Sequence, residues 1–299
     1  MITYNHQRFI EQAVLSALQQ ETTFPVEILI AEDCSRDSTR TILEQLEGAY
    51  PDRLTLHCRE KNMGMMANAM EVFRACRGEY IAFLEGDDYW TDPLKLQRQI
   101  EALESNPVFS GSFHPTVYVN KDGEPVGYTH PPTPRSSVCF KDLCYVNWPQ
   151  TCSLVLRRTA VPDMPNWMAP LSMGDWPMCL LATLSGPLHM LEEPMAHYWI
   201  HSDSVWSSRH WLRRTSDMLD AYLVLARNLP NDRTLSLLEG QGFQAKELVA
   251  RLQVVESSLS YRIGRAVTFP FRAIYDSLSG RRMGIENGFA PTHINSLHE

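Results

Sequence analysis

Three carboxylate side chains lie within four residues, at Glu85, Asp87 and Asp88. They follow a continuous apolar run, residues 80–84, of the kind found in strands that are buried on both faces of a parallel sheet. Ligands of open α/β sheets bind where such strands end, and clustered carboxylates repel one another unless a cation neutralises them. Carboxylate oxygens suit Mg²⁺ or Mn²⁺, so the segment predicts a divalent metal site. The alternative is a solvated acidic turn.

The first ninety residues alternate between strands and helices, which predicts βαβ units with the acidic segment at a sheet edge. Expected strands are 27–31, 54–57 and 80–84, and expected helices are 9–20, 39–50 and 66–75. Residues 1–4 read as the end of one more strand. Because that strand is short, we expect that it began upstream and that the start is trimmed.

The later part of the chain reads as further strands and helices joined by loops. Expected strands are 109–120, 151–156, 188–191 and 195–200, with a hairpin turn at 121–124 and a proline-containing loop at 129–137. Expected helices are 92–104, 140–146, 178–184, 211–229 and 235–260. The fold class is therefore α/β, a mostly parallel central sheet with flanking helices and a C-terminal helical appendage. We expect the α/β domain at 1–208, the appendage at 209–283 and a disordered tail at 284–299.

Composition narrows the class of protein. The net charge of -8 and the lack of a long basic run argue against general nucleic-acid binding. The start is too short and polar for a signal peptide, and no apolar run reaches the roughly 18 to 20 residues of a membrane span. Seven cysteines without a CxxC pair indicate free thiols in a reducing compartment. We therefore expect a cytoplasmic protein.

Four segments occur together in a fixed order along the chain. They are Thr3-Tyr4-Asn5-His6, Glu32-Asp33-Cys34-Ser35 followed by Asp37-Ser38-Thr39, Glu85-Gly86-Asp87-Asp88 and Gly174-Asp175-Trp176. Together they resemble the inverting family 2 glycosyltransferases, which have the glycosyltransferase-A fold, over residues 1 to about 206. The resemblance implies a nucleotide-sugar donor, a Mn²⁺ or Mg²⁺ cofactor and a hydroxyl acceptor, and it makes residues 1–208 the catalytic domain.

The resemblance also implies roles for residues near the donor's nucleoside. Thr3, Tyr4 and Asn5 match the motif that lies beside the nucleoside. Asp33 matches the acidic residue that accepts a hydrogen bond from the base, which suits the N3–H of uracil and favours a UDP-sugar. This chain departs from the Asp-Asp-Gly-Ser form of that motif, with Glu32 for the first Asp and Cys34 for Gly. Asn62, Gly64 and Asn68 are expected to line the donor site; a surface loop and helix are the alternative.

Within the acidic segment, the resemblance assigns Glu85 to the ribose, Asp87 to the metal ion and Asp88 to a supporting place. His201 matches a histidine that lies near the metal in some members; a polar loop residue is the alternative. Asp175 matches the base that deprotonates the acceptor, and it also reads as a helix N-cap. Trp176 and Trp206 are open to either sugar stacking or apolar packing.

The C-terminal segment 261–282 mixes aromatic residues with five arginines and one aspartate. Such a segment suits peripheral contact with an anionic membrane surface, and an ordinary docking helix or an oligomer contact is the alternative. The resemblance implies a transferase of surface polysaccharide or lipopolysaccharide assembly in bacteria that acts on a glycan or lipid-linked glycan, and this segment would suit work at the inner face of the cell membrane. The alternatives are a degenerate donor-binding or scaffold protein and a sugar nucleotidyltransferase.

Overall fold

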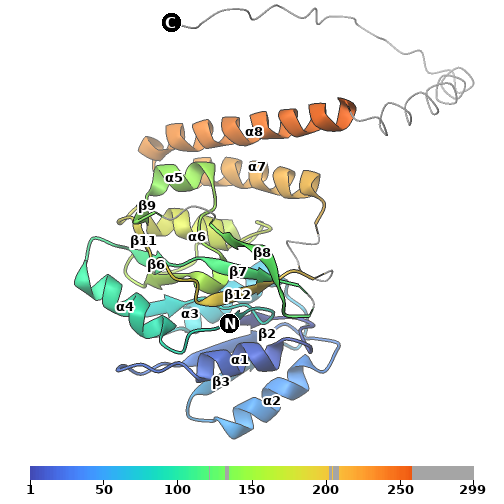
Figure 1. Ribbon diagram of the computed structural model, residues 1–299, viewed down its shortest axis with the longest axis vertical. Helices are drawn as coiled ribbons and strands as arrows, with labels where there is room; N and C mark the ends of the chain where they lie inside the picture. The colour runs from blue at the N-terminus through green and yellow to red at the C-terminus, as the bar shows by residue number, and fades with distance from the viewer. Residues whose placement is uncertain (121, 132–134, 202–203, 205–208, 258–299) are drawn as a thin grey trace, which may run out of the picture. The chain divides into compact units, whose positions relative to one another are not determined.

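The computed structural model describes residues 1–120, 122–131, 135–201, 204 and 209–257 (Figure 1). The chain divides into two compact units, Met1–Ala245 and Lys246–Glu299. The described part of the second unit, residues 246–257, continues the last helix. The expected boundary near residue 208 stays a prediction, and the tail 284–299 lies outside the described residues.

The first sheet consists of three parallel strands in the order β1-β2-β3. Its strands are β1 (Ile2–Thr3), β2 (Ile28–Glu32) and β3 (Leu54–Cys58). The helices that connect them and lead onward are α1 (Ile10–Leu18), α2 (Thr39–Ala49) and α3 (Met65–Ala75). The βαβ pattern expected from the sequence is confirmed in this part of the chain.

Two further sheets follow. One has the order β4-β10-β6-β11-β9 and contains Tyr80–Ala82, Val155–Arg157, Gly111–Phe113, Leu188–Met190 and Ser137–Val138 in that order. The other has the order β5-β12-β7-β8 and contains Tyr89–Trp90, Ala196–Trp199, Thr116–Val119 and Pro125–His130. Within them β11 pairs with β6, and β12 with β7, in parallel, while the other pairs are antiparallel.

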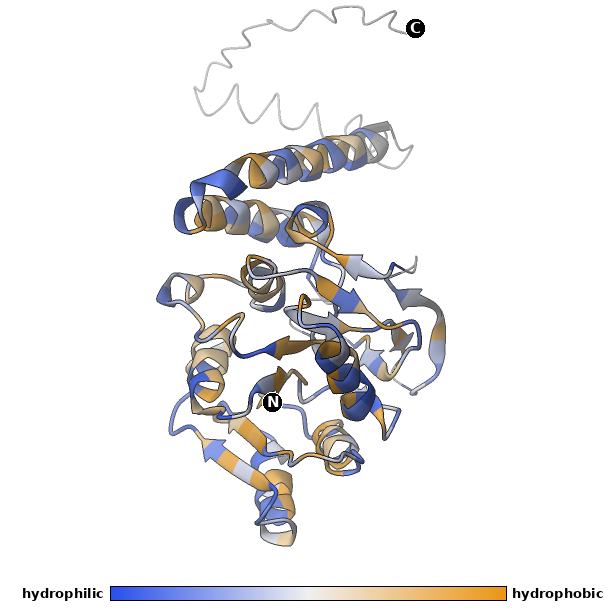
Figure 2. Cartoon of the chain, turned by 90° about the vertical axis from the view of Figure 1, so that its left-hand side faces the viewer, coloured by the Kyte–Doolittle hydropathy of each residue, from blue (hydrophilic) through white to orange (hydrophobic). Residues whose placement is uncertain are grey.

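The remaining helices are α4 (Lys95–Ser105), α5 (Phe140–Tyr145), α6 (Asp175–Ala182), α7 (Trp211–Asn228) and α8 (Thr234–Ser257). They carry both hydrophobic and hydrophilic residues along their lengths (Figure 2). Among the described residues, no helix combines the length and apolarity that crossing a bilayer requires.

Buried apolar side chains form two clusters. One joins α1 and α2 to the first sheet through residues such as Ile10, Ile30 and Leu43. The other contains side chains from α5, α6 and α7, including Trp176 of α6 and Tyr222 of α7. Each fully buried large apolar side chain stabilises the fold by about 1.5–3 kcal/mol, so these clusters fix the strand ends that carry the polar residues.

Three expected elements differ from the structure by more than shifted ends. The strand expected at 109–120 breaks at Pro115, where the chain leaves β6 in one sheet and enters β7 in another; proline has no N–H for a sheet ladder. Residues 151–153 form a 3-10 turn, so the strand expected at 151–156 begins only at Val155. The expected loop at 129–137 contains the ends of β8 and β9, and residues 132–134 lie outside the described part.

Candidate active site

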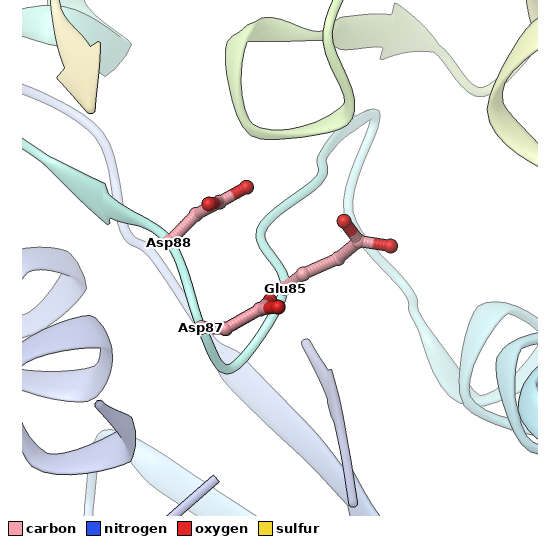
Figure 3. A group of neighbouring side chains, drawn as sticks. All are labelled: Glu85, Asp87 and Asp88. Carbon is pink, nitrogen blue, oxygen red and sulfur yellow. The ribbon is translucent and has the colours of Figure 1, made fainter. Parts of the chain in front are cut away.

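The acidic segment forms the turn between β4 and β5 (Figure 3). One carboxylate oxygen from each of Glu85, Asp87 and Asp88 lies within 4.8 Å of the others. The turn is fixed to β1, because Gly86 N–H donates to the carbonyl of Ile2 at 3.0 Å and Ile2 pairs with Glu85 in a parallel bridge. The three side chains predicted as a metal site therefore meet at the ends of two neighbouring strands.

The pKa values of the three carboxylates are shifted in different directions. Burial, followed by the charges of Asp87 and Asp175, raises the pKa of Glu85 to about 8. Burial and the same kind of repulsion raise the pKa of Asp88 well above its usual value. Burial also opposes ionisation of Asp87, but His6 and the hydrogen bond from His201 outweigh it and lower the pKa of Asp87. Asp87 is thus the member of the group that stays ionised most readily.

The residues present fit a divalent cation. The cluster offers hard oxygen donors, and repulsion among them is the condition that a cation relieves. Asp88 Oδ1 accepts from Trp199 N–H at 3.1 Å, while its Oδ2 is buried without a hydrogen-bond partner among the described residues. His201 Nε2 lies 3.1 Å from Asp87 Oδ2, which places the predicted metal histidine beside the predicted metal aspartate.

The loops after β1 and β2 are tied together by hydrogen bonds. Asn5 N–H donates to Ser35 Oγ at 2.9 Å, and Asn5 Oδ1 accepts from Arg36 N–H at 2.8 Å. The N–H of His6 donates to Thr39 Oγ1 at 2.8 Å. Asn5 has a positive φ of 57°, which turns the chain between these contacts. The two loops predicted to face the nucleoside are therefore joined by hydrogen bonds. We call Thr3, which is buried, Tyr4, which is half-buried, and Asn5 the ledge.

Asp33 organises the loop before α3. Its two carboxylate oxygens accept from the N–H groups of Met63 and Gly64 at 2.7 and 2.9 Å, and its carbonyl accepts from Asn62 Nδ2 at 3.1 Å. Each carboxylate oxygen has a second lone pair, so the predicted contact with a base is compatible with these bonds. The structure therefore brings together Asp33, Asn62 and Gly64, all predicted to belong to the donor site.

Two neighbouring residues have structural partners. Asn68 is buried, its Oδ1 accepts from Arg59 Nε, and its Nδ2 donates to the carbonyl of Ala31. Glu32 is fully buried and forms an ion pair with Arg40, so the longer acid that replaces the motif's Asp binds a side chain of α2. The side chains of Asn68 and Glu32 are thus both bonded to other groups of the protein.

Asp175 is the first residue of α6, with Gly174 at the N-cap. Its Oδ2 accepts from Asn147 Nδ2 at 3.0 Å. Burial raises the pKa of Asp175, although hydrogen bonds from the Trp176 N–H and from Asn147 partly oppose that rise. The charge of Asp175 also contributes to the raised pKa of Glu85, so the two carboxylates interact electrostatically. A carboxylate with a raised pKa is a better proton acceptor than an ordinary one.

The two tryptophans differ in what the structure shows. Trp176 is fully buried, packs edge-on against Tyr222 and donates its Nε1–H to the carbonyl of Leu143. Of the two possibilities left open for Trp176, apolar packing is therefore the one observed. Trp206 lies outside the described residues.

Two residues of the site had no assigned role in the sequence. His6 stands in the quoted Thr-Tyr-Asn-His segment, and its place directly after β1 was a signal that could have linked it to the acidic turn. Asn147 carries no comparable signal, because it meets Asp175 across 28 residues of chain.

The family follows from a comparison of the sequence with known proteins. The model of the family described as "Glycosyl transferase family 2" matches residues 1–155, which include the ledge, Asp33 and the acidic turn. The chain belongs to this family.

Two relatives and one solved structure extend the comparison. An uncharacterized protein of Mycobacterium tuberculosis is 37% identical over 214 residues, covering 71% of this chain and 61% of the relative. The putative teichuronic acid biosynthesis glycosyltransferase TuaG of Bacillus subtilis is 29% identical over 214 residues, 70% of this chain and 80% of TuaG. The chain therefore spans less than two thirds of the mycobacterial relative's length.

The crystal structure of residues 1–349 of TarS from S. aureus, in complex with UDP-GlcNAc, superposes with a TM-score of 0.61. It shares 16% identity and covers 87% of this chain and 76% of TarS 1–349. This likeness establishes the glycosyltransferase-A fold, and with it the expected α/β class is confirmed.

Proposed function

We propose that this protein transfers a sugar from a nucleotide-sugar donor, a UDP-sugar, to a hydroxyl group with inversion at the anomeric carbon. The observation that carries the proposal is the group of Glu85, Asp87 and Asp88 in the turn that pairs with β1, with the charge of Asp175 acting on Glu85. The UDP-GlcNAc bound by TarS supports the donor class. The match to TuaG supports an acceptor that belongs to a surface polysaccharide.

In the proposed reaction, the acceptor oxygen attacks the anomeric carbon as the bond from that carbon to the diphosphate oxygen breaks. Asp175 takes the acceptor's proton, and its position at the start of α6 and its bond to Asn147 fix the direction of that carboxylate. The ledge of Thr3, Tyr4 and Asn5 holds the nucleoside, with Asp33 at the base and Glu85 at the ribose. The products are the glycoside and a nucleoside diphosphate.

Asp87, supported by Asp88 and His201, would hold the divalent cation. When bound, Mn²⁺ or Mg²⁺ neutralises charge on the departing diphosphate as a Lewis acid. The protein's own contribution is to keep the carboxylate group gathered and partly shielded from water before the donor arrives.

The first test is calorimetry with UDP in the presence and absence of Mn²⁺. We expect Mn²⁺-dependent binding in the wild type and its loss in Asp87→Ala, because the ion's main ligand is gone. Asp122→Ala, which removes an exposed acid in the β7–β8 turn, is the matched control. Equal UDP affinity in wild type and Asp87→Ala would remove Asp87 from the metal site.

The second test separates binding from chemistry. Asp175→Asn keeps the shape and the contact with Asn147 but cannot take a proton, so UDP binding should persist while transfer falls by about 10²–10⁴-fold. Transfer is followed as UDP release in a screen of UDP-sugars with polysaccharide or lipid-linked acceptors. Wild-type turnover in Asp175→Asn would eliminate Asp175 as the base.

We also propose that the protein contacts the membrane surface peripherally through the basic segment 261–282, which lies outside the described residues. Removal of residues 261–299 should abolish co-flotation with vesicles that contain phosphatidylglycerol, and 0.5 M salt should weaken flotation of the full chain. Salt-insensitive flotation, or flotation of the truncated chain, would contradict this contact.

A further inference from the structure

Asp87 lies between two imidazole rings. His201 Nε2 is 3.1 Å from Asp87 Oδ2, and His6 Nε2 is 3.8 Å from the same oxygen. The two histidines come from opposite ends of the domain's sequence, and all three side chains are at most 15% exposed. An acid enclosed in this way has few rotamers to choose from.

The His6 ring is anchored on its far side. Its Nδ1 lies 3.1 Å from Thr3 Oγ1, within hydrogen-bond distance. Its backbone N–H donates to Thr39 Oγ1, and the Thr39 hydroxyl donates to Asp37 Oδ1 at 2.6 Å. Its carbonyl accepts from the N–H of Ile10 at the start of α1. Both the backbone and the ring of His6 are therefore held independently of Asp87.

Gly86 gives independent support for a built contact between these segments. A Cβ atom at position 86 would lie 2.5 Å from Thr3 Oγ1 and 2.9 Å from His6 Nδ1, both closer than real Cβ contacts allow. Glycine at this position is what lets the Thr3–His6 pair approach the acidic turn. Among the ion pairs of the described residues, His6 lies next to Asp87 and to no other acid of the turn.

We propose that His6 is a positioning residue for the metal-binding carboxylate. The Thr3 hydroxyl donates to His6 Nδ1, which leaves the ring proton on Nε2, facing Asp87 Oδ2. His6 and His201 then hold the carboxylate from two sides, so that it is oriented before the cation binds. Residues that orient a metal ligand in this way typically change metal affinity by about 10–100-fold when they are removed. The inference rests on the proposed function, in which Asp87 is a metal ligand.

The test measures Mn²⁺ affinity directly, by the loss of the free Mn²⁺ signal in electron paramagnetic resonance, without donor and again with saturating UDP. His6→Gln keeps an N–H at about the position of Nε2, whereas His6→Asn keeps only a group near Nδ1. We expect the Mn²⁺ dissociation constant to rise about tenfold in His6→Asn and His6→Ala, and to stay within about twofold in His6→Gln. His189→Asn, which alters a half-buried histidine of β11 that pairs with the carbonyl of Ser136, is the control and should match the wild type.

Each result bears on the inference. Unchanged Mn²⁺ affinity in His6→Asn would overturn it, and so would equal losses in His6→Gln and His6→Asn, because the ring itself would then be needed. Absence of Mn²⁺ binding to the wild type, with and without UDP, would also overturn it. Mn²⁺ binding together with failure to use any UDP-sugar would count against the proposed donor and leave the inference on His6 standing. Thermal unfolding midpoints within a few degrees of the wild type establish that the variants are folded.

Discussion

Cys34 occupies a backbone conformation that its side chain disfavours. It has a φ of +61°, in the left-handed region, two residues after the end of β2 and beside Asp33. This conformation costs a residue other than glycine roughly 1–2 kcal/mol. Its thiol lies 3.5 Å from the carbonyl of Glu60, a weak contact. Cys34 therefore adopts the positive φ of this turn, which the glycine of the family's motif would adopt at lower cost.

Replacement of Cys34 by glycine is therefore expected to stabilise the protein. The gain from relieved strain exceeds the greater entropy of a glycine in the unfolded chain, and we expect a net increase of about 0.5–1 kcal/mol in the free energy of unfolding. Urea unfolding measures it. Cys34→Ala loses the same thiol and keeps the strain, so it serves as the control. Equal stabilities of the two variants would refute the argument.

The residues of the site differ in how far sequence alone predicted them. The acidic turn was predictable because its three carboxylates and the strand before it are contiguous. The roles of His6 and Asn147 were not, because each depends on a partner brought close by tertiary packing, Asp87 and Asp175 respectively. The role of Asp33 toward Met63 and Gly64 depends in the same way on a loop 30 residues away.

At the scale of elements, α8 packs closely against the end of α5. A Cβ at Gly240 would lie 2.0 Å from the carbonyl oxygen of Cys144, a contact that no side chain can make. The same carbonyl accepts a hydrogen bond from the Tyr222 hydroxyl of α7. Gly242, two residues further along α8, has no atom within 4 Å of such a Cβ.

This difference predicts opposite effects from one substitution at two positions. Gly240→Ala should destabilise the protein by about 1–3 kcal/mol, because α8 must move away from α5. Gly242→Ala should stabilise it by about 0.5–1 kcal/mol, because alanine favours the helix and meets open space. Thermal unfolding of both variants provides the comparison. A melting temperature of Gly240→Ala at or above that of Gly242→Ala would contradict the packing.

Element types were predictable where periodicity was long and continuous. The expected helix at 39–50 and the observed α2 (Thr39–Ala49) differ by one residue, and α7 and the expected 211–229 agree as closely. The prediction of a single strand at 109–120 was wrong, because its two halves belong to different sheets. The local sequence pattern does not show which sheet a strand joins.

At the scale of the molecule, strand direction depends on partners far along the chain. The first sheet is parallel as expected, but β4 pairs antiparallel with β10, more than 70 residues later. The sequence shows that residues 80–84 are apolar, and a buried strand of either direction satisfies that pattern. The comparison with TarS settles the fold class, whereas the pairing of each strand comes from the structure.

A buried lysine links the stability of the whole protein to pH. Lys95 of α4 is fully buried, donates from Nζ to Gln99 Oε1 at 2.6 Å and lies 4.3 Å from the centre of the Trp90 ring. Burial lowers the pKa of Lys95 from 10.5 to about 7. Below pH 7 the lysine is charged in both the folded and the unfolded state, so the folded protein carries the full cost of the buried charge.

Between pH 7 and pH 10 the unfolded chain binds more protons at Lys95 than the folded protein does, so the contribution of Lys95 to stability rises with pH. Lys95→Met removes this titration. The variant also leaves Gln99 Oε1 without the Lys95 donor, but the free-energy cost of that loss does not vary with pH. The free energy of unfolding of the wild type relative to Lys95→Met should therefore increase from pH 7 to pH 10, by at most about 4 kcal/mol at about 1.4 kcal/mol per pKa unit. Urea unfolding of both proteins at four pH values measures the difference, in which titrations common to both proteins cancel. A difference that stays constant, or that falls with pH, would show that Lys95 remains protonated in the folded protein.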